Sequence, residues 1–412
     1  MHSRILAAWL IFTSAVTFMS QPTYAQQKVV RSWVEYKFGE QITFNTEIKS
    51  PSPIETAVIF FQALNDTHTN VGLGRVEHIE DDLYRLSYTH PLKDYRLRSF
   101  TRVDYHWELT NSEEDKQQLA INSFDYVDNR YRWNSLEEKP FKVYWFDETG
   151  NVKFAQSVID AAQAGYKNAD DLLPVTIPND SLDIYVYPDS ESMHEVLQQN
   201  NQDWVAGHAD ADLGVIVVTL PPGPDQKLLI DQRIPHELMH ILVYQYTDPG
   251  YKNLPTWLNE GLASQVELYP NSDYPVLLED AVKREALIPM ISLCQTFPRD
   301  ASRALLSYAQ AASFTKYLYS TFGTTGLVDL VRAYANGLDC QRGAQQALGQ
   351  SLTQLERGWR SDVLSIDTVQ AAINNLLPWV ILLLAVLAVP VVIAVRHLRD
   401  RPNTAPAEQR NT

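Results

Sequence analysis

A pair of histidines at helical spacing, followed by a second acidic segment, offers the clearest chemistry in this chain. His236 begins the string H-E-L-M-H, and His240 ends it, so on a helix both imidazoles leave the same face. Two such imidazoles can bind one zinc ion, with Glu237 beside a water on that ion. Glu260, within W-L-N-E-G-L-A at 257–263, is the natural third ligand. The two segments predict a zinc hydrolase.

The residues around these segments distinguish a metal site from a chance match. An H-E-x-x-H string can arise by chance, and a histidine-rich helix face can be merely amphipathic. Ile241, Leu242 and Val243 follow the string directly, as expected for a helix buried beside a cleft. Trp257 and Leu258 give the second segment an apolar anchor around its acid. These flanks favour the metal site.

Together the two segments resemble the signature of the gluzincin metallopeptidases, which include the aminopeptidase-N family. Nineteen residues separate His240 from Glu260, near the usual interval of that family. The whole chain looks most like bacterial peptidase MA-like membrane proteins, and the specific motifs cover about residues 204–320. The chain lacks the G-x-M-x-N element with which the aminopeptidases hold a free amino terminus. That absence argues against exopeptidase action, although the sequence leaves endopeptidase and exopeptidase action as the two alternatives.

The resemblance also implies roles for three further residues. Tyr308 begins Y-A-Q-A-A-S-F, which resembles the segment of the family's transition-state tyrosine, but the usual Lys-Gly does not follow. Glu267 lies seven residues after Glu260, where the family places an acid that supports a metal-binding imidazole. Packing of Tyr308 on a helix face and solvation of Glu267 are the alternatives. His208 lies where the edge strand of the cleft is expected, either as a substrate contact or as a strand histidine.

The predicted reaction is hydrolysis of a peptide bond with one Zn²⁺ per chain. A zinc ion held by His236, His240 and Glu260 lowers the pKa of its water to about 7. Glu237 takes the proton of that water and then passes it to the leaving amine. One alternative is a binding or adhesion protein on a peptidase scaffold, and another is hydrolysis of a non-peptide amide or epoxide. Because the three ligands and the base are all present, we expect an active enzyme, and the family resemblance implies a peptide or protein substrate.

Apolar segments near both ends predict where the protein is located. Residues 1–25 have the pattern of a secretory signal peptide, with cleavage after Ala25. Residues 376–395 are an uncharged run that, at about 1.5 Å per residue, can cross a bilayer core of about 30 Å. Arg396 and further basic residues follow, which places 396–412 in the cytoplasm. We expect a single-pass cell-membrane protein whose catalytic part lies outside.

Charge and cysteine content narrow the class of protein further. The formal net charge of −16 argues against nucleic acid as a partner, because phosphate binding needs a basic surface. Cys294 and Cys340 both fall on the expected outer side. A disulfide between them and two buried free thiols are the two alternatives, and an oxidising compartment favours the disulfide.

The region between the apolar ends, about 345 residues, is long enough for two domains. Residues 26–138 alternate apolar and polar side chains in short runs, most clearly at 103–109, which predicts an antiparallel β-sandwich. Residues 139–366 predict a gluzincin-like catalytic domain with a mixed sheet, an active-site helix and then a helical half. Residues 367–375 form a linker to the transmembrane helix. The predicted fold class is therefore α+β.

A proline complicates the active-site helix, which should start somewhere in 225–234 and end near Tyr246. Pro235 immediately precedes His236. A proline inside a helix removes one hydrogen bond and clashes with the preceding turn. Either the helix begins near Ile234, with Pro235 in its first turn, or it is kinked at Pro235.

Overall fold

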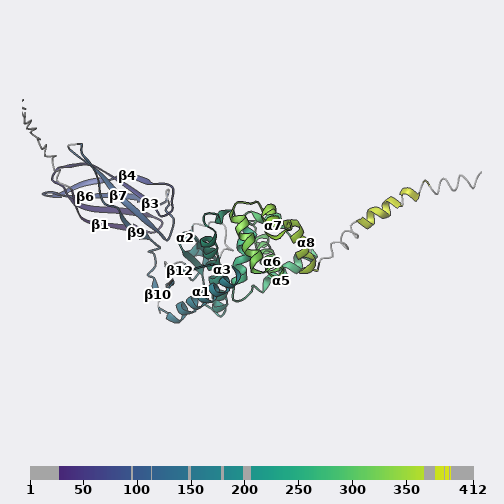
Figure 1. Cartoon of the computed structure of the whole chain (residues 1–412). Coiled ribbons are helices and arrows are strands. Elements are labelled where there is room, and N and C mark those ends of the chain that lie inside the picture. The colour runs from purple at the N-terminus through teal and green to yellow at the C-terminus, as the bar shows by residue number, and fades with distance from the viewer. Residues whose placement is uncertain are drawn as a thin grey trace, which may run out of the picture. The chain divides into compact units, whose positions relative to one another are not determined.

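The computed structural model describes residues 27–93, 96–112, 114–146, 150–177, 181–197, 206–365, 376–384, 386–388 and 390 (Figure 1). The chain divides into two compact units between Arg130 and Tyr131. This boundary lies before the predicted one at 138, because β10 (Asn134–Glu138) pairs with β11 (Phe141–Trp145) of the second unit. The predicted signal peptide, linker and cytoplasmic tail lie outside the described residues.

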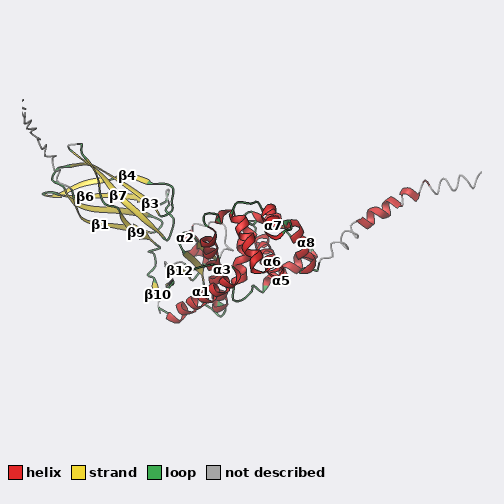
Figure 2. Ribbon diagram, viewed as in Figure 1, coloured by secondary structure: helices red, strands yellow, loops and turns green. Residues whose placement is uncertain are grey.

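The first unit consists of two antiparallel sheets packed face to face, shown by the yellow strands in Figure 2. One sheet has the order β1 (Lys28–Lys37), β2 (Gln41–Lys49), β6 (Leu83–Pro91), β5 (Arg75–Glu80). The other has the order β4 (Asn70–Leu73), β3 (Ile54–Ala63), β7 (Thr101–Asn111), β8 (Lys116–Gln118), and β9 (Asn122–Tyr126) also pairs with β7. Phe44 of β2 contacts Phe61 of β3 and Tyr105 of β7, with ring centroids 4.9 and 5.1 Å apart. The aromatic core thus joins the two sheets.

The second unit begins with a mixed sheet in the order β10-β11-β12-β14-β13. β11, β12 (Leu182–Tyr187) and β14 (Val215–Thr219) are parallel, and β10 and β13 (Gly207–Asp210) are antiparallel edges. β14 is buried along its whole length, as expected for a strand covered on both faces. Helix α1 (Val152–Leu172) contacts β10 and β11, α2 (Ser190–Leu197) contacts β12 and β14, and α3 (Gln226–Thr247) contacts β13 and β14.

A helical half follows the sheet. It contains η1 (Tyr251–Asn253), α4 (Thr256–Val266), α5 (Asp273–Lys283), η2 (Met290–Cys294), α6 (Ala301–Ala335), α7 (Cys340–Leu348) and α8 (Leu352–Asp362). Phe314 of α6 packs between Trp257 of α4 and Trp359 of α8, with ring centroids 5.0 and 5.7 Å away. Cys294 and Cys340 form a disulfide that joins η2 to the start of α7.

These elements give the α+β class that the sequence predicted, with strands first and a helical half after them. The membrane span predicted at 376–395 is not confirmed: among the described residues, no helix is long and apolar enough to cross a bilayer. Of that segment, residues 385, 389 and 391–395 are not described.

Pro235 lies inside α3, which begins at Gln226 and thus within the predicted range 225–234; of the two alternatives, the structure excludes a helix that begins near Ile234. Because proline has no backbone N–H, the carbonyl oxygen of Asp231 loses its usual partner within the helix. The backbone N–H of Leu268, just beyond α4, donates to that oxygen at 2.9 Å instead. The proline therefore leaves an acceptor on α3 that holds the end of α4.

The ring of Pro235 also packs closely against α1, and this contact generates a stability prediction. A Cβ added at Gly165 would lie 2.7 Å from Pro235 Cβ and 2.9 Å from Pro235 Cα. We expect Gly165→Ala to lower the free energy of unfolding by about 1–3 kcal/mol, because α1 and α3 would have to separate. Urea denaturation measures the change. An increase in stability, as for Gly-to-Ala at an unobstructed helix site, would show that the two helices do not approach so closely.

Candidate metal centre

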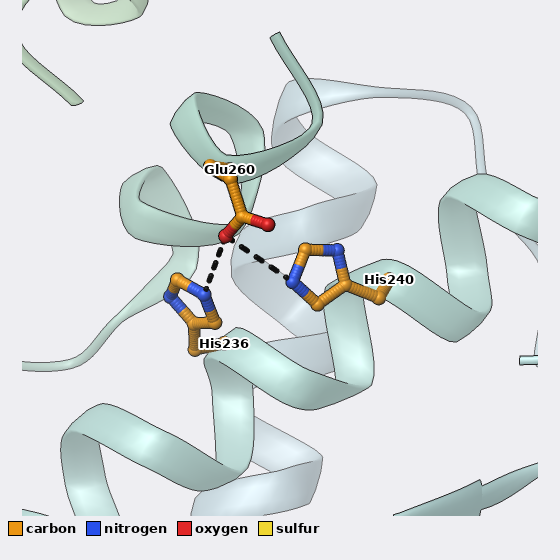
Figure 3. Close-up of side chains that lie close together, drawn as sticks. All are labelled: His236, His240 and Glu260. Carbon is orange, nitrogen blue, oxygen red and sulfur yellow. Dashed lines mark hydrogen bonds and ion pairs between the residues drawn. The ribbon is translucent and has the colours of Figure 1, made fainter. Parts of the chain in front are cut away.

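The three predicted ligands meet between α3 and α4 (Figure 3). His236 Nε2 and His240 Nε2 lie 3.3 and 3.6 Å from the same oxygen, Oε2 of Glu260. The three ligand atoms all lie within 4.8 Å of one another. The side chains are 15, 11 and 16% exposed, in that order. Two imidazole nitrogens and one carboxylate oxygen thus converge on one nearly buried point.

Close packing of α4 explains how Glu260 is held. Trp257 and Leu258, at the start of this helix, are fully buried. On the same face, one turn further along, a Cβ added at Gly261 would lie 2.7 Å from the carbonyl oxygen of Ala311 in α6. Because glycine lets α4 and α6 approach this closely, α4 is fixed between α6 and the active-site helix.

Glu267 fixes the orientation of the first histidine. Its Oε1 lies 2.9 Å from Nδ1 of His236, and its side chain is 7% exposed. A carboxylate at Nδ1 keeps a proton there and leaves Nε2 to face a metal. The bond between Leu268 N and Asp231 O anchors the backbone directly after Glu267 to α3. Pro235, by leaving that carbonyl free, thereby helps to position Glu267.

The charges around the two imidazoles shift their protonation strongly. Burial lowers the pKa of His236, but hydrogen bonds to Glu260 and Glu267 outweigh burial, so the pKa lies well above its usual value. Burial likewise lowers the pKa of His240, and the charge of Glu260 outweighs it, so that pKa is also raised. For Glu260, burial raises the pKa, but the interactions with His240 and His236 lower it by more, so the pKa of Glu260 lies below its usual value.

This donor set fits a single divalent cation. Two imidazole nitrogens and a carboxylate oxygen at one point are a ligand set that suits zinc. Two carboxylates, Glu260 and Glu267, lie beside the imidazoles. A bound cation would displace the protons of the imidazoles and would then offset the negative charge of the carboxylates. His240 Nδ1 is buried and has no hydrogen-bond partner among the described residues. In the described part of the chain, only His236 of the two imidazoles therefore has a protein acceptor at its Nδ1.

Glu237 lies between this cluster and the edge strand of the sheet. Its side chain belongs to α3, is 9% exposed, and faces Gly207 at the start of β13. A Cβ added at Gly207 would lie 2.9 Å from Cδ of Glu237. Glycine at this position therefore leaves the space that the carboxylate occupies. The sequence analysis did not identify Gly207, because nothing local marks it as lying against α3.

His208 faces away from Glu237. Successive side chains along a strand point to opposite faces. A side chain at Gly207 would point toward Glu237. His208, the next residue of β13, pairs with Val217 and directs its side chain to the other face. The structure thus does not bring this histidine to the metal centre.

Tyr308 and Tyr251 both lie within electrostatic reach of the site's carboxylates. Burial, then the charges of Glu260 and Glu237, raise the pKa of Tyr308 well above its usual value. Burial and the same two charges raise the pKa of Tyr251 to about 12. Asn259 Nδ2 donates to the Tyr251 hydroxyl at 2.9 Å. Both phenols thus stay protonated at neutral pH and can donate hydrogen bonds.

Tyr251 is a residue that sequence reasoning missed. It lies in η1, between the active-site helix and α4, and no helical or strand periodicity relates it to the ligands. Tyr274 of α5 was missed for the same reason; burial, then the charges of Glu267 and Glu260, raise its pKa. Only the folded arrangement brings these phenols near the carboxylates.

With this geometry described, comparison with known families locates the same region. Residues 161–365 match the Peptidase MA superfamily. The match contains α3, α4 and α6, and so all of the ligands, Glu237 and Tyr308. It supports a peptidase MA-like family and a peptidase-like hydrolase. No curated protein matches the chain.

Solved structures show weaker likenesses. Legionella pneumophila aminopeptidase A in complex with aspartic acid is 12% identical, with a TM-score of 0.34, covering 81% of this chain and 49% of that one. OgpA from Akkermansia muciniphila is 14% identical, with a TM-score of 0.20, covering 24% of this chain and 27% of that one. A structure titled as a myokine is 10% identical, with a TM-score of 0.19, covering 24% and 96%. Scores this low do not establish a shared fold.

The contact between Glu267 and His236 generates a prediction about metal affinity. Glu267→Gln should weaken zinc binding about 10–100-fold, because the imidazole loses its charged acceptor. Competition with a chromophoric chelator measures the affinity. Glu279→Gln on α5, which removes an exposed acid paired with Lys283, is the matched control and should bind zinc like the wild type. Equal affinities in the two variants would contradict the role of Glu267.

The raised histidine pKa values predict a pH dependence of zinc binding. Below the pKa of His236 and His240 a proton occupies the ligand nitrogen, so binding must release it and weakens as pH falls. Unshifted histidines, with a pKa of about 6.5, would give nearly constant affinity above about pH 7.5. We expect the affinity to keep rising between about pH 6.5 and 8, as measured by the same competition assay. A plateau that begins at about pH 7.5 would mean that the imidazoles are not shifted.

Proposed function

We propose that the second unit is a zinc metallopeptidase in which Glu237 acts as general base. The observation that carries this proposal is the convergence of His236, His240 and Glu260 on one point, with Glu237 beside them at the edge strand. The match of residues 161–365 to the Peptidase MA superfamily supports it.

Each residue of the site has a role that its position allows. A bound zinc ion would supply Lewis-acid chemistry and lower the pKa of water there. The Glu237 carboxylate would take a proton from the attacking water and pass it to the leaving amine. The protonated hydroxyls of Tyr308 and Tyr251 would donate hydrogen bonds to the oxyanion that forms from the peptide carbonyl. Glu267 holds His236 in place while this happens.

We also propose that this unit works outside the cytoplasm. Disulfides persist in oxidising compartments, and the described structure contains one between Cys294 and Cys340. The signal-peptide pattern of residues 1–25 supports the same location. Anchoring by residues 376–395 stays a prediction from sequence.

The first experiment compares the wild type with Glu237→Gln. Both proteins are loaded with zinc and incubated with a diverse peptide mixture, and mass spectrometry identifies the cuts. Glu237→Gln should bind zinc as the wild type does and cleave at least about 100-fold more slowly, because it cannot accept the proton. The distance of the cuts from the peptide termini separates endopeptidase from exopeptidase action.

Cuts made by a contaminating protease would persist in the variant, so only cuts that disappear in Glu237→Gln are assigned to this protein. Identical cleavage by both proteins would contradict the role of Glu237. If the zinc-loaded wild type produced no cuts at all, a binding protein on a peptidase scaffold would be the better description.

A further inference from the structure

Arg233 occupies the helix face that carries the chemistry, but neither the metal centre nor the proposed reaction uses it. It belongs to α3, where residues 233, 236, 237 and 240 follow the spacing of one helical face. Arg233 therefore lies one turn before Glu237 and on the same side of α3. Helical side chains lean toward the N-terminus, so the guanidinium extends along the site away from His240.

The contacts of Arg233 leave most of its hydrogen-bonding capacity unused. Its Nη1 donates to the carbonyl oxygen of Thr219 at the end of β14. Among the residues that the structure describes, no carboxylate forms an ion pair with it within 4.0 Å, and the side chain is partly buried. A guanidinium has five N–H donors, so the remaining ones can bind a ligand. Burial lowers the pKa of Arg233, while the charge of Glu237 raises it.

The hydrogen bond to Thr219 locates Arg233 near the start of the edge strand β13. Thr219, which accepts from Arg233, also donates through its backbone N–H to Ala206 at 2.9 Å. The next residue, Gly207, faces Glu237. Arg233 and Glu237 therefore lie side by side beneath the start of β13, with the cation on the side away from His240.

A partly buried cation without a carboxylate partner is costly unless a ligand or a nearby charge offsets the cost. Glu237 is a nearby charge, so Arg233 has two possible roles. It could only tune Glu237, in which case every substrate would depend on it equally. It could instead bind a substrate group, in which case only substrates carrying that group would depend on it.

We propose that Arg233 binds a carboxylate of the peptide substrate close to the bond that is cleaved. The proposal rests on the proposed peptidase function. A planar guanidinium matches a carboxylate through two parallel hydrogen bonds. One helical turn is about 5.4 Å and an extended peptide advances about 3.3–3.6 Å per residue, so the carboxylate lies within about two residues of the cleaved bond. The carboxylate belongs either to an Asp or Glu side chain or to the peptide's C-terminus.

Alanine-based peptides that differ in one group test the proposal and separate the two sources. In one set, Glu replaces Gln at each position in turn; in the other, a free C-terminal carboxylate replaces an amide. The wild type should cleave the carboxylate member of at least one pair about 10–100-fold faster in kcat/KM, as expected for a charge-assisted bidentate contact. In Arg233→Gln, which keeps an N–H donor for Thr219, that ratio should fall to about 1.

Lys227→Gln is the matched control, because it removes another cation of α3 whose partner is Asp231. It should keep the wild-type ratio. Preference for Glu over Gln assigns the side chain as the source, and preference for free acid over amide assigns the C-terminus. No preference in the wild type, or an unchanged ratio in Arg233→Gln, overturns the proposal. An equal loss for both members of a pair means that Arg233 only tunes Glu237.

Equilibrium binding of the same peptide pairs to zinc-loaded Glu237→Gln, with and without Arg233→Gln, gives a readout that needs no turnover. A carboxylate preference that disappears with Arg233→Gln would support the binding role even if the wild type cleaved no peptide. Cleavage without such a preference would leave the peptidase function standing and overturn the role of Arg233. The two proposals can thus fail separately.

Discussion

The contact between α3 and α4 is the constraint on which the site depends. The imidazole of His236 lies between two carboxylates, Glu260 and Glu267, that come from α4 and its C-terminal cap. All three side chains are largely shielded from water, where an unbalanced charge is expensive. Protons on the imidazoles balance the carboxylates in the protein alone, and a divalent cation would do so in their place. The charge balance of the site therefore depends on how closely α3 and α4 approach each other.

The phenols extend the same electrostatic logic. Tyr251, Tyr274 and Tyr308 come from three different segments, yet burial and nearby carboxylates raise the pKa of each. A hydroxyl in this environment does not ionise at any pH near neutrality. The site therefore combines groups that exchange protons with phenols that stay protonated and can donate hydrogen bonds. General base chemistry and oxyanion stabilisation need one of each kind.

Local spacing predicted the parts of the site that lie on single helices. The interval between His236 and His240 depends on helical geometry and can be read from sequence, whereas the role of Glu267, at the C-cap of α4, was implied by the family resemblance. Gly207 and Tyr251 could not be found in this way, because their distance from Glu237 depends on how a strand and a connecting turn pack against α3. The division between the two units falls before β10, because that strand has its partner in the second unit.

Pro235 shows how helix stability and site geometry can conflict. Proline is the poorest helix former, by about 3 kcal/mol relative to alanine, so a redesign guided by stability would replace it first. The new backbone N–H would then compete with Leu268 for the carbonyl oxygen of Asp231. A more regular helix would come at the expense of the anchor that follows Glu267. For protein engineering, this proline belongs with the functional residues, although its own side chain performs no chemistry.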